Sequence, residues 1–254
     1  MLKLLSCNIR CDYEQDGINC FRFRRDALKQ AILTNLPDVI CFQEVLPHVA
    51  SWLKQELSGC YYVVGCGRDS ELRNEQTSIA YRFDRLNLIS MKTYWLSPTP
   101  DIPGSRFEDQ SDCPRVCTEV VLEDFSDGEL YRIVSIHLDH IGSGARQEGL
   151  DLLLNKLEHP SSFTRAHIIM AGDFNALPDA PEFDAFSKYP GYRDAAADSG
   201  GTWHDYGRRQ PADKIDYVFV KDLEGDKPRL WTHCRDGVYL SDHYPVEVSL
   251  YVRK

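Results

Sequence analysis

The chain has 254 residues, of which 43% are hydrophobic, so it can bury a sizeable core, and its length suits one large α/β or sandwich domain. Lysine and arginine number 29 against 39 aspartates and glutamates, and the formal charge of −10 argues against a processive nucleic-acid binder because it repels polyanions. An odd count of nine cysteines, without a C-x-x-C pair, argues against a secreted disulfide framework.

Short runs of strand-forming residues recur along the chain and alternate with helical patterns. Helical spacing of apolar residues predicts one helix that ends before Pro37, another from Ala145 to Glu158, and a short one that begins near Asp179. The stretch from Leu96 to Cys113 has no apolar period and is expected to be a long loop. This order of elements predicts an α/β fold in one domain over residues 1–254. The expected strands are Leu2 to Leu5, Val39 to Phe42, Ser78 to Tyr81, Val116 to Leu122, Tyr131 to Ile136, Ile168 to Met170, Tyr217 to Val220 and Val246 to Val252.

Residues suited to metal or phosphate chemistry stand at the ends of six of these runs. If the last two strands run antiparallel to the other four, all six groups reach the same edge of the sheets. A single asparagine or aspartate at a strand end is usually a turn former, so only the occurrence of all six groups together indicates a site. The residues that follow a run are Asn8, Glu44, His137, Asp173 and Asn175, and those that precede one are Asp216, Asp242 and His243.

The carboxylates in this set predict a divalent cation. Mg²⁺ prefers oxygen ligands and retains waters, and Asn8, Glu44 and Asp242 supply a site of that type, with Mn²⁺ as an alternative. An ionised carboxylate at the end of a buried strand is costly unless it is paired or metal-bound. The cation would bind a non-bridging phosphate oxygen and stabilise charge on the leaving oxygen. The sequence leaves open whether one or two cations bind.

The remaining residues of the set suit the transfer of a phosphoryl group to water. Asp173 is placed to orient or deprotonate the attacking water, and the amide of Asn175 can donate to the phosphoryl group. His243, oriented by Asp216, and His137 can donate hydrogen bonds to the phosphate and transfer protons near neutral pH. Either Asp173 or His243 could be the general base, because the pair can titrate as a coupled unit.

The same residues lie in six motifs that resemble those of the endonuclease/exonuclease/phosphatase superfamily, which has the deoxyribonuclease I-like fold. The resemblance covers nearly the whole chain and implies a four-layered α/β sandwich, with two packed mixed β-sheets flanked by helices and a phosphoesterase site at one edge. It also suggests that Glu75 orients His137, with a solvated loop charge as the equal alternative. The motifs are S-C-N-I-R at 6–10, F-Q-E-V at 42–45, S-I-H-L at 135–138, G-D-F-N at 172–175, K-I-D-Y-V-F at 214–219 and S-D-H-Y-P-V at 241–246.

Departures from the family's patterns narrow the resemblance. Arg10 and His137 stand where abasic-site endonucleases carry other residues, so an abasic-site repair role is disfavoured. The chain is more similar to a bacterial branch that shares S-I-H-L-D-H at 135–140 and W-L-S-x-T-P at 95–100. G-T-W-H-D at 201–205 is similar to the T-W-D-T segment of tyrosyl-DNA phosphodiesterases. Trp203 could therefore stack on a base or an aromatic leaving group, although a buried core tryptophan is the commoner case.

Four further polar residues carry alternative interpretations. Arg146, which the bacterial branch also shares, could clamp a substrate phosphate or form a salt bridge with Asp139, and we expect both to lie behind the residues that touch substrate. His140 and His204 are candidates for substrate contact only.

The motifs together predict a magnesium-dependent hydrolase of a phosphate ester, acting on a small molecule, nucleotide or lipid head group. They do not choose between a phosphomonoester and a phosphodiester. A nuclease or DNA-end-processing phosphodiesterase is the alternative, and the net charge disfavours it. A non-catalytic binding module would be expected to lose at least one motif residue, and none is lost. With no signal-type segment and no long apolar run, we expect a soluble, cytoplasmic monomer without a membrane span.

Overall fold

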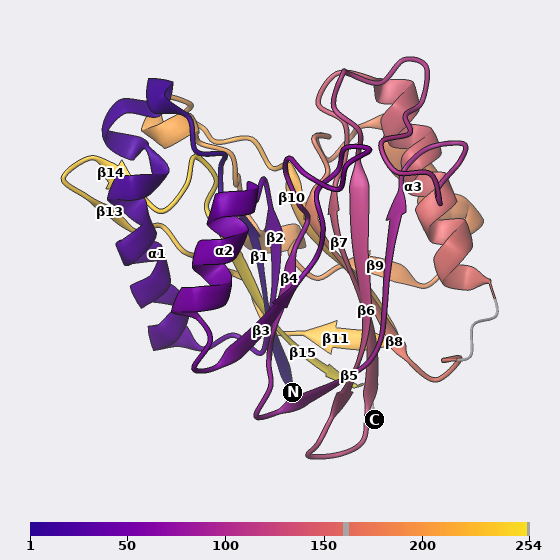
Figure 1. Cartoon of the computed structure of the whole chain (residues 1–254). Helices are drawn as coiled ribbons and strands as arrows, with labels where there is room; N and C mark the ends of the chain where they lie inside the picture. Colours follow the sequence, from indigo (N-terminus) through magenta and orange to yellow (C-terminus); the bar gives the residue numbers. More distant parts are fainter. Residues whose placement is uncertain (160–162, 253–254) are drawn as a thin grey trace.

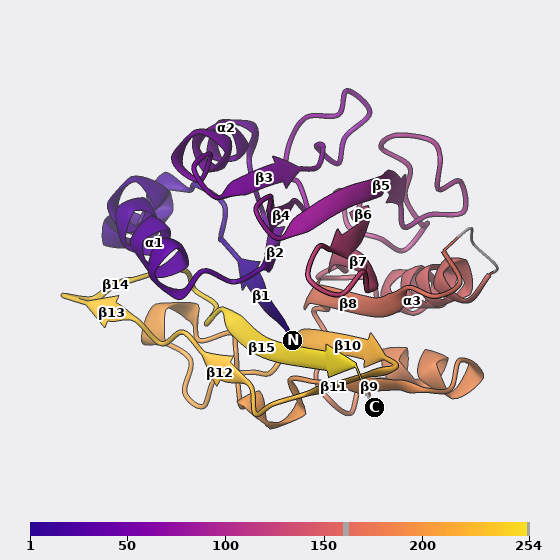
Figure 2. The same ribbon diagram turned by 90° about the horizontal axis from the view of Figure 1, so that it is seen from below.

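The computed structural model describes residues 1–159 and 163–252 and places two β-sheets face to face, with helices on both outer sides (Figures 1 and 2). These four layers confirm the predicted fold class. Each described helix is too short or too polar to cross a lipid bilayer.

The first sheet has the strand order β11-β15-β1-β2-β4-β3, and β12 pairs with β15. Its central strands β1 and β2 are parallel, and β15 runs antiparallel to β1, as the sequence predicted for the strand after Asp242. The strands are β1 (Leu2–Asn8), β2 (Val39–Gln43), β3 (Tyr61–Val64), β4 (Ile79–Arg82), β11 (Leu223–Gly225), β12 (Arg229–Leu230) and β15 (Val246–Val252).

The second sheet has the order β5-β6-β7-β8-β10-β9. Here β7 and β8 are parallel, and β10 runs antiparallel to β8, which is the orientation that brings Asp216 to the same edge as His137 and Asp173. The strands are β5 (Leu86–Trp95), β6 (Val116–Asp124), β7 (Leu130–His137), β8 (His167–Asp173), β9 (Tyr192–Asp194) and β10 (Asp216–Lys221), and a separate hairpin joins β13 (Cys234–Arg235) to β14 (Val238–Tyr239).

The helices cover the outer faces of the two sheets. Helices α1 (Phe21–Asn35) and α2 (Pro47–Glu56) lie on the first sheet, and α3 (Ser143–Glu158) lies on the second with the 3-10 helix η2 (Pro181–Lys188), as Figure 2 shows. The short helix expected near Asp179 is therefore present as a 3-10 helix. Three further 3-10 segments are η1 (Glu14–Asn19), η3 (Ala197–Ser199) and η4 (Asp205–Gly207).

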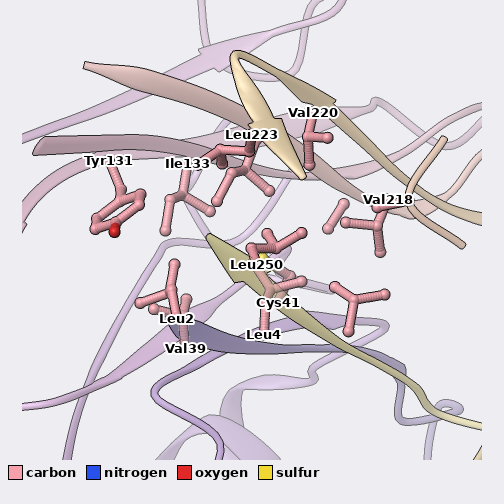
Figure 3. Close-up of a cluster of buried hydrophobic side chains, with 14 of the residues drawn as sticks. Leu2, Leu4, Val39, Cys41, Tyr131, Ile133, Val218, Val220, Leu223 and Leu250 are labelled. Atoms are coloured by element: carbon pink, nitrogen blue, oxygen red, sulfur yellow. The ribbon is translucent and has the colours of Figure 1, made fainter. Parts of the chain in front are cut away.

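Alternation along the strands builds three layers of core. In β1, Leu2 and Leu4 point between the sheets whereas Leu5 points toward α1 and α2, because successive side chains of a strand face opposite sides. Figure 3 shows Leu2 and Leu4 of the first sheet facing Ile133 and other residues of the second. Strands buried on both faces need continuous apolar runs, which explains the composition of β1, β7 and β8.

A buried arginine ties the first helix to the loops around the site. The side chain of Arg24 is 0% exposed and donates to the backbone carbonyls of Asn19 at 2.9 Å, Leu240 at 3.0 Å and Arg10 at 2.7 Å, and also to that of Ile9. These carbonyls belong to the segment after β1 and to the segment before Asp242. Arg24 therefore links two stretches of chain that are remote in sequence.

Arg24→Met is expected to lower the free energy of unfolding by about 3 kcal/mol or more, because it leaves several buried carbonyls without a donor. Urea denaturation would measure the change. Arg25→Met is the matched control, since the Arg25 side chain is 45% exposed and should tolerate the change. Equal stability of the two variants would contradict a structural role for Arg24.

Candidate active site

Three of the predicted residues lie in one row across the second sheet. His137 is the register partner of Asp173 in the β7/β8 pair, and Asp173 is the register partner of Asp216 in the β8/β10 pair. The residue before Asp173 must be small: a Cβ at Gly172, whose φ is 154°, would lie 1.9 Å from the carbonyl oxygen of Ile136. Glycine thus lets β7 and β8 pair closely where the functional groups begin.

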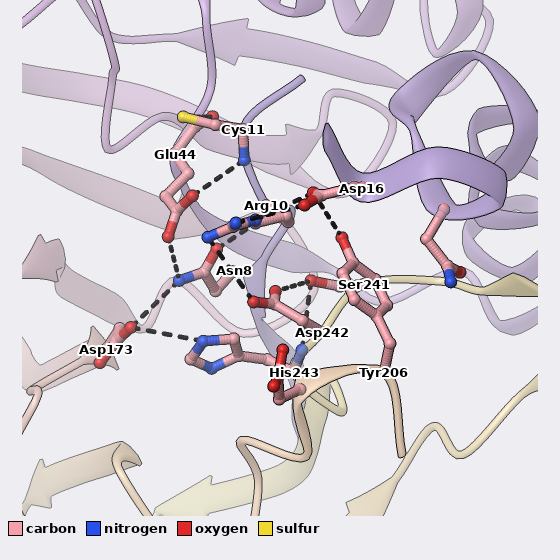
Figure 4. A network of polar contacts seen from close by, with 12 residues as sticks. Asn8, Arg10, Cys11, Asp16, Glu44, Asp173, Tyr206, Ser241, Asp242 and His243 are labelled. Carbon is pink, nitrogen blue, oxygen red and sulfur yellow. Dashed lines mark hydrogen bonds and ion pairs between the residues drawn. The ribbon is translucent and has the colours of Figure 1, made fainter. Parts of the chain in front are cut away.

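Asn8 joins this row to the first sheet. Its amide nitrogen donates to Glu44 Oε1 and to Asp173 Oδ2, each at 3.0 Å, as Figure 4 shows. Its amide oxygen accepts from the backbone nitrogen of Arg10 at 3.0 Å. Asn8 thus presents nitrogen to the two carboxylates, which favours a positioning role over the metal-ligand role expected from sequence.

Glu44 follows β2 in a left-handed backbone conformation with a φ of 61°. Its second oxygen accepts from the backbone nitrogen of Cys11 at 2.8 Å. Burial opposes its ionisation, but the nearby His137 and Arg10, together with the donated hydrogen bonds, lower the pKa of Glu44 to about 2. Glu44 therefore carries its negative charge throughout the neutral range.

Asp216 holds the imidazole of His243. The Oδ2 of Asp216 lies 2.8 Å from Nδ1 of His243, and both side chains are buried. Burial alone would lower the pKa of His243, but the charge and hydrogen bond of Asp216 raise it to about 10. The predicted Asp216–His243 pair is formed, and it leaves Nε2 of His243 directed to a second carboxylate.

That second carboxylate is Asp173, which lies between two imidazoles. Its Oδ2 is 3.7 Å from Nε2 of His243 and 3.5 Å from Nε2 of His137, and its Oδ1 accepts from the backbone nitrogen of Asn175 at 2.9 Å. Burial and the charge of Asp216 raise the pKa of Asp173 to about 7. Asp173 can therefore accept a proton near neutral pH.

His137 and Asn175 occupy the wall of the same space. Burial lowers the pKa of His137 well below its usual range, and the positive charge of Arg115 acts in the same direction. Asn175 has a left-handed φ of 47°, and its amide nitrogen donates to the carbonyl of Leu138 at 3.0 Å. That contact fixes the amide beside Asp173.

Glu75 does not pair with His137 as the resemblance suggested. Its carboxylate instead binds the guanidinium of Arg68, with distances of 2.8 Å and 2.6 Å to the two terminal nitrogens. The carboxylate beside His137 is instead that of Asp173, whose Oδ2 lies 3.5 Å from His137 Nε2. Glu75 was also not the solvated loop charge of the alternative, because it is 9% exposed. The buried Arg68, which belongs to none of the sequence motifs, holds the Glu75 side chain in place.

The side chains around the cavity offer oxygen donors of the kind that a hard divalent cation binds. Asp242 is buried and burial raises its pKa, although the positive charges of His243, Arg10 and Arg24 act in the opposite direction, Arg10 from 3.8 Å away. Burial also raises the pKa of Asp173. With Glu44 and Asp216 nearby, four carboxylates share one buried region, and such crowding of negative charge is offset when a cation binds. The oxygen donors present fit Mg²⁺ or Mn²⁺.

Among the described residues, two groups of at least three His, Cys, Asp or Glu side chains bring their ligand atoms within 4.8 Å of one another: Cys11 with Glu44 and Glu75, and Asp173 with Asp216 and His243. The second group is the hydrogen-bonded row described above. The first contains a thiol, which suits Mg²⁺ poorly, and burial raises the pKa of Cys11 far above its usual range.

A cavity of about 620 Å³ opens over these groups and defines the candidate active site. Asn8 and Asp216 lie behind its wall, where they hold the residues that line it. Several of the wall residues belong to none of the sequence motifs. The predicted residues in the wall are Glu44, Glu75, His137, His140, Asp173, Asn175, Trp203, Asp242 and His243, and the missed ones include Tyr13, Arg68, Cys113, Arg115, Leu177 and Ile215.

The structure also places the residues that had alternative interpretations. Arg146 forms its salt bridge with Glu182 at 2.7 Å, not with the Asp139 side chain, and reaches only the carbonyl of Asp139 at 3.0 Å. Trp203 is half-buried in the cavity wall, with the Arg209 guanidinium 4.8 Å from its ring centre.

The two histidines that were candidates for substrate contact, His140 and His204, differ in their position relative to the cavity. His204 is buried and stacks on Tyr244, with ring centres 3.8 Å apart, so it does not reach the cavity. His140 lines the cavity, and its Nδ1 lies 2.8 Å from Nη2 of Arg115. Only His140 therefore remains a candidate for substrate contact.

The chain is similar to a known protein family and to several solved structures. Residues 5–243 match the model of the Endonuclease/Exonuclease/phosphatase family. An endonuclease/exonuclease/phosphatase from Bacteroides vulgatus is 27% identical with a TM-score of 0.92, covering 99% of each chain. The mannosyl-6-phosphatase Bt3783 from Bacteroides thetaiotaomicron is 25% identical with a TM-score of 0.88, covering 99% of this chain and 100% of that one.

Solved structures with lower sequence identity are similar to this chain in fold only. TDP2 from D. rerio, complexed with a single strand DNA product, is 21% identical with a TM-score of 0.78, and 99% of each chain is covered. A search of curated proteins gave no match. The match over residues 5–243 and the two-sheet architecture lead to one conclusion: the chain belongs to the Endonuclease/Exonuclease/phosphatase family and has its deoxyribonuclease I-like fold.

Proposed function

We propose that this chain is a divalent-metal-dependent phosphoesterase that hydrolyses a small phosphorylated substrate by in-line attack of water. The observation that carries the proposal is the buried group of carboxylates and imidazoles around Asp173, at the floor of an open cavity. Glu44 and Asp242 would hold the cation, and Asn8 would position Glu44 and Asp173. The cation, when bound, would offset charge on a phosphoryl oxygen and on the leaving oxygen.

The geometry supports separate roles for the acid and the two imidazoles. His243 lies between two carboxylates, Asp216 at 2.8 Å and Asp173 at 3.7 Å, an arrangement that stabilises its protonated, hydrogen-bond-donating form. Asp173 is then the better acceptor for the proton of the attacking water. His137 and Asn175 would donate hydrogen bonds to the phosphoryl oxygens. The water oxygen bonds to phosphorus as the bond from phosphorus to the alcohol oxygen breaks.

This proposal predicts hydrolysis of 4-nitrophenyl phosphate that depends on added cation. Removal of divalent cations with EDTA is expected to lower kcat by at least about 100-fold, and added Mg²⁺ or Mn²⁺ should restore it. Release of 4-nitrophenolate gives the rate. Because the structurally similar Bacteroides thetaiotaomicron protein is a mannosyl-6-phosphatase, sugar phosphates are the first natural substrates to test. Full turnover in EDTA would count against the metal dependence.

Nucleic acid is a second candidate substrate, favoured by one observation. Trp203 lies in the cavity wall, where an aromatic ring can stack on a base. The net charge of −10 opposes it, and the guanidinium of Arg209 already lies over the Trp203 ring. Nicking of supercoiled plasmid at physiological salt would support the nuclease, and its absence beside turnover of the aryl phosphate would support the small substrate.

A further inference from the structure

Two buried arginines line the cavity without a part in the mechanism above. Arg115 immediately precedes β6 and is 4% exposed, and Arg68 lies in the loop between β3 and β4 and is 9% exposed. Burying a guanidinium is costly unless its charge and its donors are matched. The contacts of these two side chains show which guanidinium nitrogens have a hydrogen-bond acceptor within the protein and which do not.

Two of the three guanidinium nitrogens of Arg115 have partners within the described residues. Its Nε donates to Asp139 at 3.3 Å and its Nη2 lies 2.8 Å from His140 Nδ1. No partner is recorded for Nη1 among residues 1–159 and 163–252, and this atom is not among the fully enclosed ones. Because Arg115 lines the cavity, the free donor reaches solvent through it.

Asp139 fixes the direction of that guanidinium. Its carboxylate accepts from the hydroxyl of Ser111 and from the backbone nitrogens of Ile141 at 2.9 Å and Gly142 at 2.8 Å. These hydrogen bonds lower the pKa of Asp139 despite burial, so it stays ionised. Arg115 therefore needs no reorganisation to receive an anion.

Arg68 adds a second positive charge beside the first. Its terminal nitrogens bind Glu75, and Nη2 also contacts the sulfur of Cys113 at 3.2 Å. Its Nε is buried and has no partner within the described part of the chain. An unpaired buried donor is unfavourable, and an incoming acceptor that reached it would relieve that cost.

Both arginines adjoin the group proposed to contact the scissile phosphate. They lie close enough to His137 that their charges, after burial itself, lower its pKa, with Arg115 exerting the larger effect. A second, small hollow is lined by Arg68, Arg115, His137 and Glu44 together. The arginines therefore flank the phosphoryl position and not a distant part of the substrate.

We propose that Arg115, supported by Arg68, restricts the enzyme to phosphate monoesters. A monoester at pH 7 carries a charge of about −1.5 to −2 and three terminal oxygens, whereas a diester carries one charge and two such oxygens. A second ester arm at this wall would face buried guanidinium donors without pairing them, which is a strong basis for rejection. The inference rests on the proposed phosphoesterase function and names its substrate class.

The test compares two substrates that differ by one methyl group and one charge, 4-nitrophenyl phosphate and methyl 4-nitrophenyl phosphate. Arg115→Met is expected to lower kcat/KM for the monoester by about 100-fold and for the diester by less than about 5-fold. The two substrates differ in intrinsic reactivity, but this difference is the same for the wild type and for each variant. A change in the ratio of kcat/KM for the monoester to kcat/KM for the diester therefore reports a change in selectivity. A merely structural defect would lower both rates equally and leave the ratio unchanged.

Arg115→Lys keeps the charge without the planar fork, and it guards against misfolding of the methionine variant. We expect it to retain part of the selectivity. Arg73→Met, in the same loop as Arg68 but with a side chain 76% exposed, is the control and should leave both rates unchanged. Titration calorimetry with inorganic phosphate gives a readout without turnover, and Arg115→Met should weaken that binding at least about 10-fold.

The outcomes separate the inference from the function beneath it. If the diester is hydrolysed as well as the monoester, or the ratio survives Arg115→Met, monoester selection is wrong while the phosphoesterase stands. If neither compound is turned over with Mg²⁺ or Mn²⁺, the phosphoesterase proposal fails and the inference falls with it.

Discussion

Replacing Glu44 by glutamine is expected to lower kcat/KM with Mg²⁺ by about 10³-fold, which corresponds to about 4 kcal/mol of lost transition-state stabilisation. Glutamine preserves the shape of the side chain and an acceptor for the backbone nitrogen of Cys11, so the fold should survive. It removes the negative charge that the first sheet contributes to the proposed cation site. Titration calorimetry with Mn²⁺ should show a matching loss of affinity.

Glu148→Gln is the matched control, because Glu148 is exposed on α3 and lines none of the cavities described above. It should leave both the Mn²⁺ affinity and the rate unchanged. Wild-type Mn²⁺ affinity in Glu44→Gln would remove Glu44 from the cation site, whatever happened to the rate.

The second large effect is expected at Asp216. Asp216→Asn should lower kcat by about 10²- to 10⁴-fold with little change in KM, because the amide can no longer hold His243 as a charged donor. In the structure, Asp216 contacts His243 at 2.8 Å but does not line the cavity, so the loss would act through orientation and charge. Steady-state kinetics with 4-nitrophenyl phosphate would separate kcat from KM.

Asp222→Asn provides the comparison at the opposite end of the same strand. Asp222 follows β10, is exposed, and has a left-handed φ of 61° that asparagine also tolerates. It should behave as wild type. A kcat for Asp216→Asn within a few-fold of wild type would show that His243 does not need its carboxylate partner.

The gathering of the site could be predicted because strand direction decides where strand ends lie. Asn8 is the last residue of a strand that is parallel to β2, and Asp242 precedes an antiparallel strand, so both lie at one edge once the pairing directions are known. Arg115 obeys the same rule, since it directly precedes β6, which runs antiparallel to β7. A charged residue just before a buried run was a signal that sequence analysis overlooked.

Other features depend on contacts that no local pattern contains. Glu75 pairs with Arg68 from a turn seven residues away, and the shape of that loop, with left-handed Leu72 and Asn74, decides the pairing. Strand β5 was missed because only one of its faces is buried and its exposed residues include Ile89 and Met91, which blur the alternation. Helix α2 was missed because its apolar face is only a few residues wide.

The pairing of β1 with β15 has a consequence for how the protein is made. Leu2 lies opposite Leu250, so β1, which can pair with β2 early in synthesis, meets its second neighbour only after β15 has been made. Contacts so remote in sequence close late in folding. Asp242 and His243 arrive with that same strand. The candidate site is therefore completed only when β15 has paired with β1, after the strands that carry its other residues have been made.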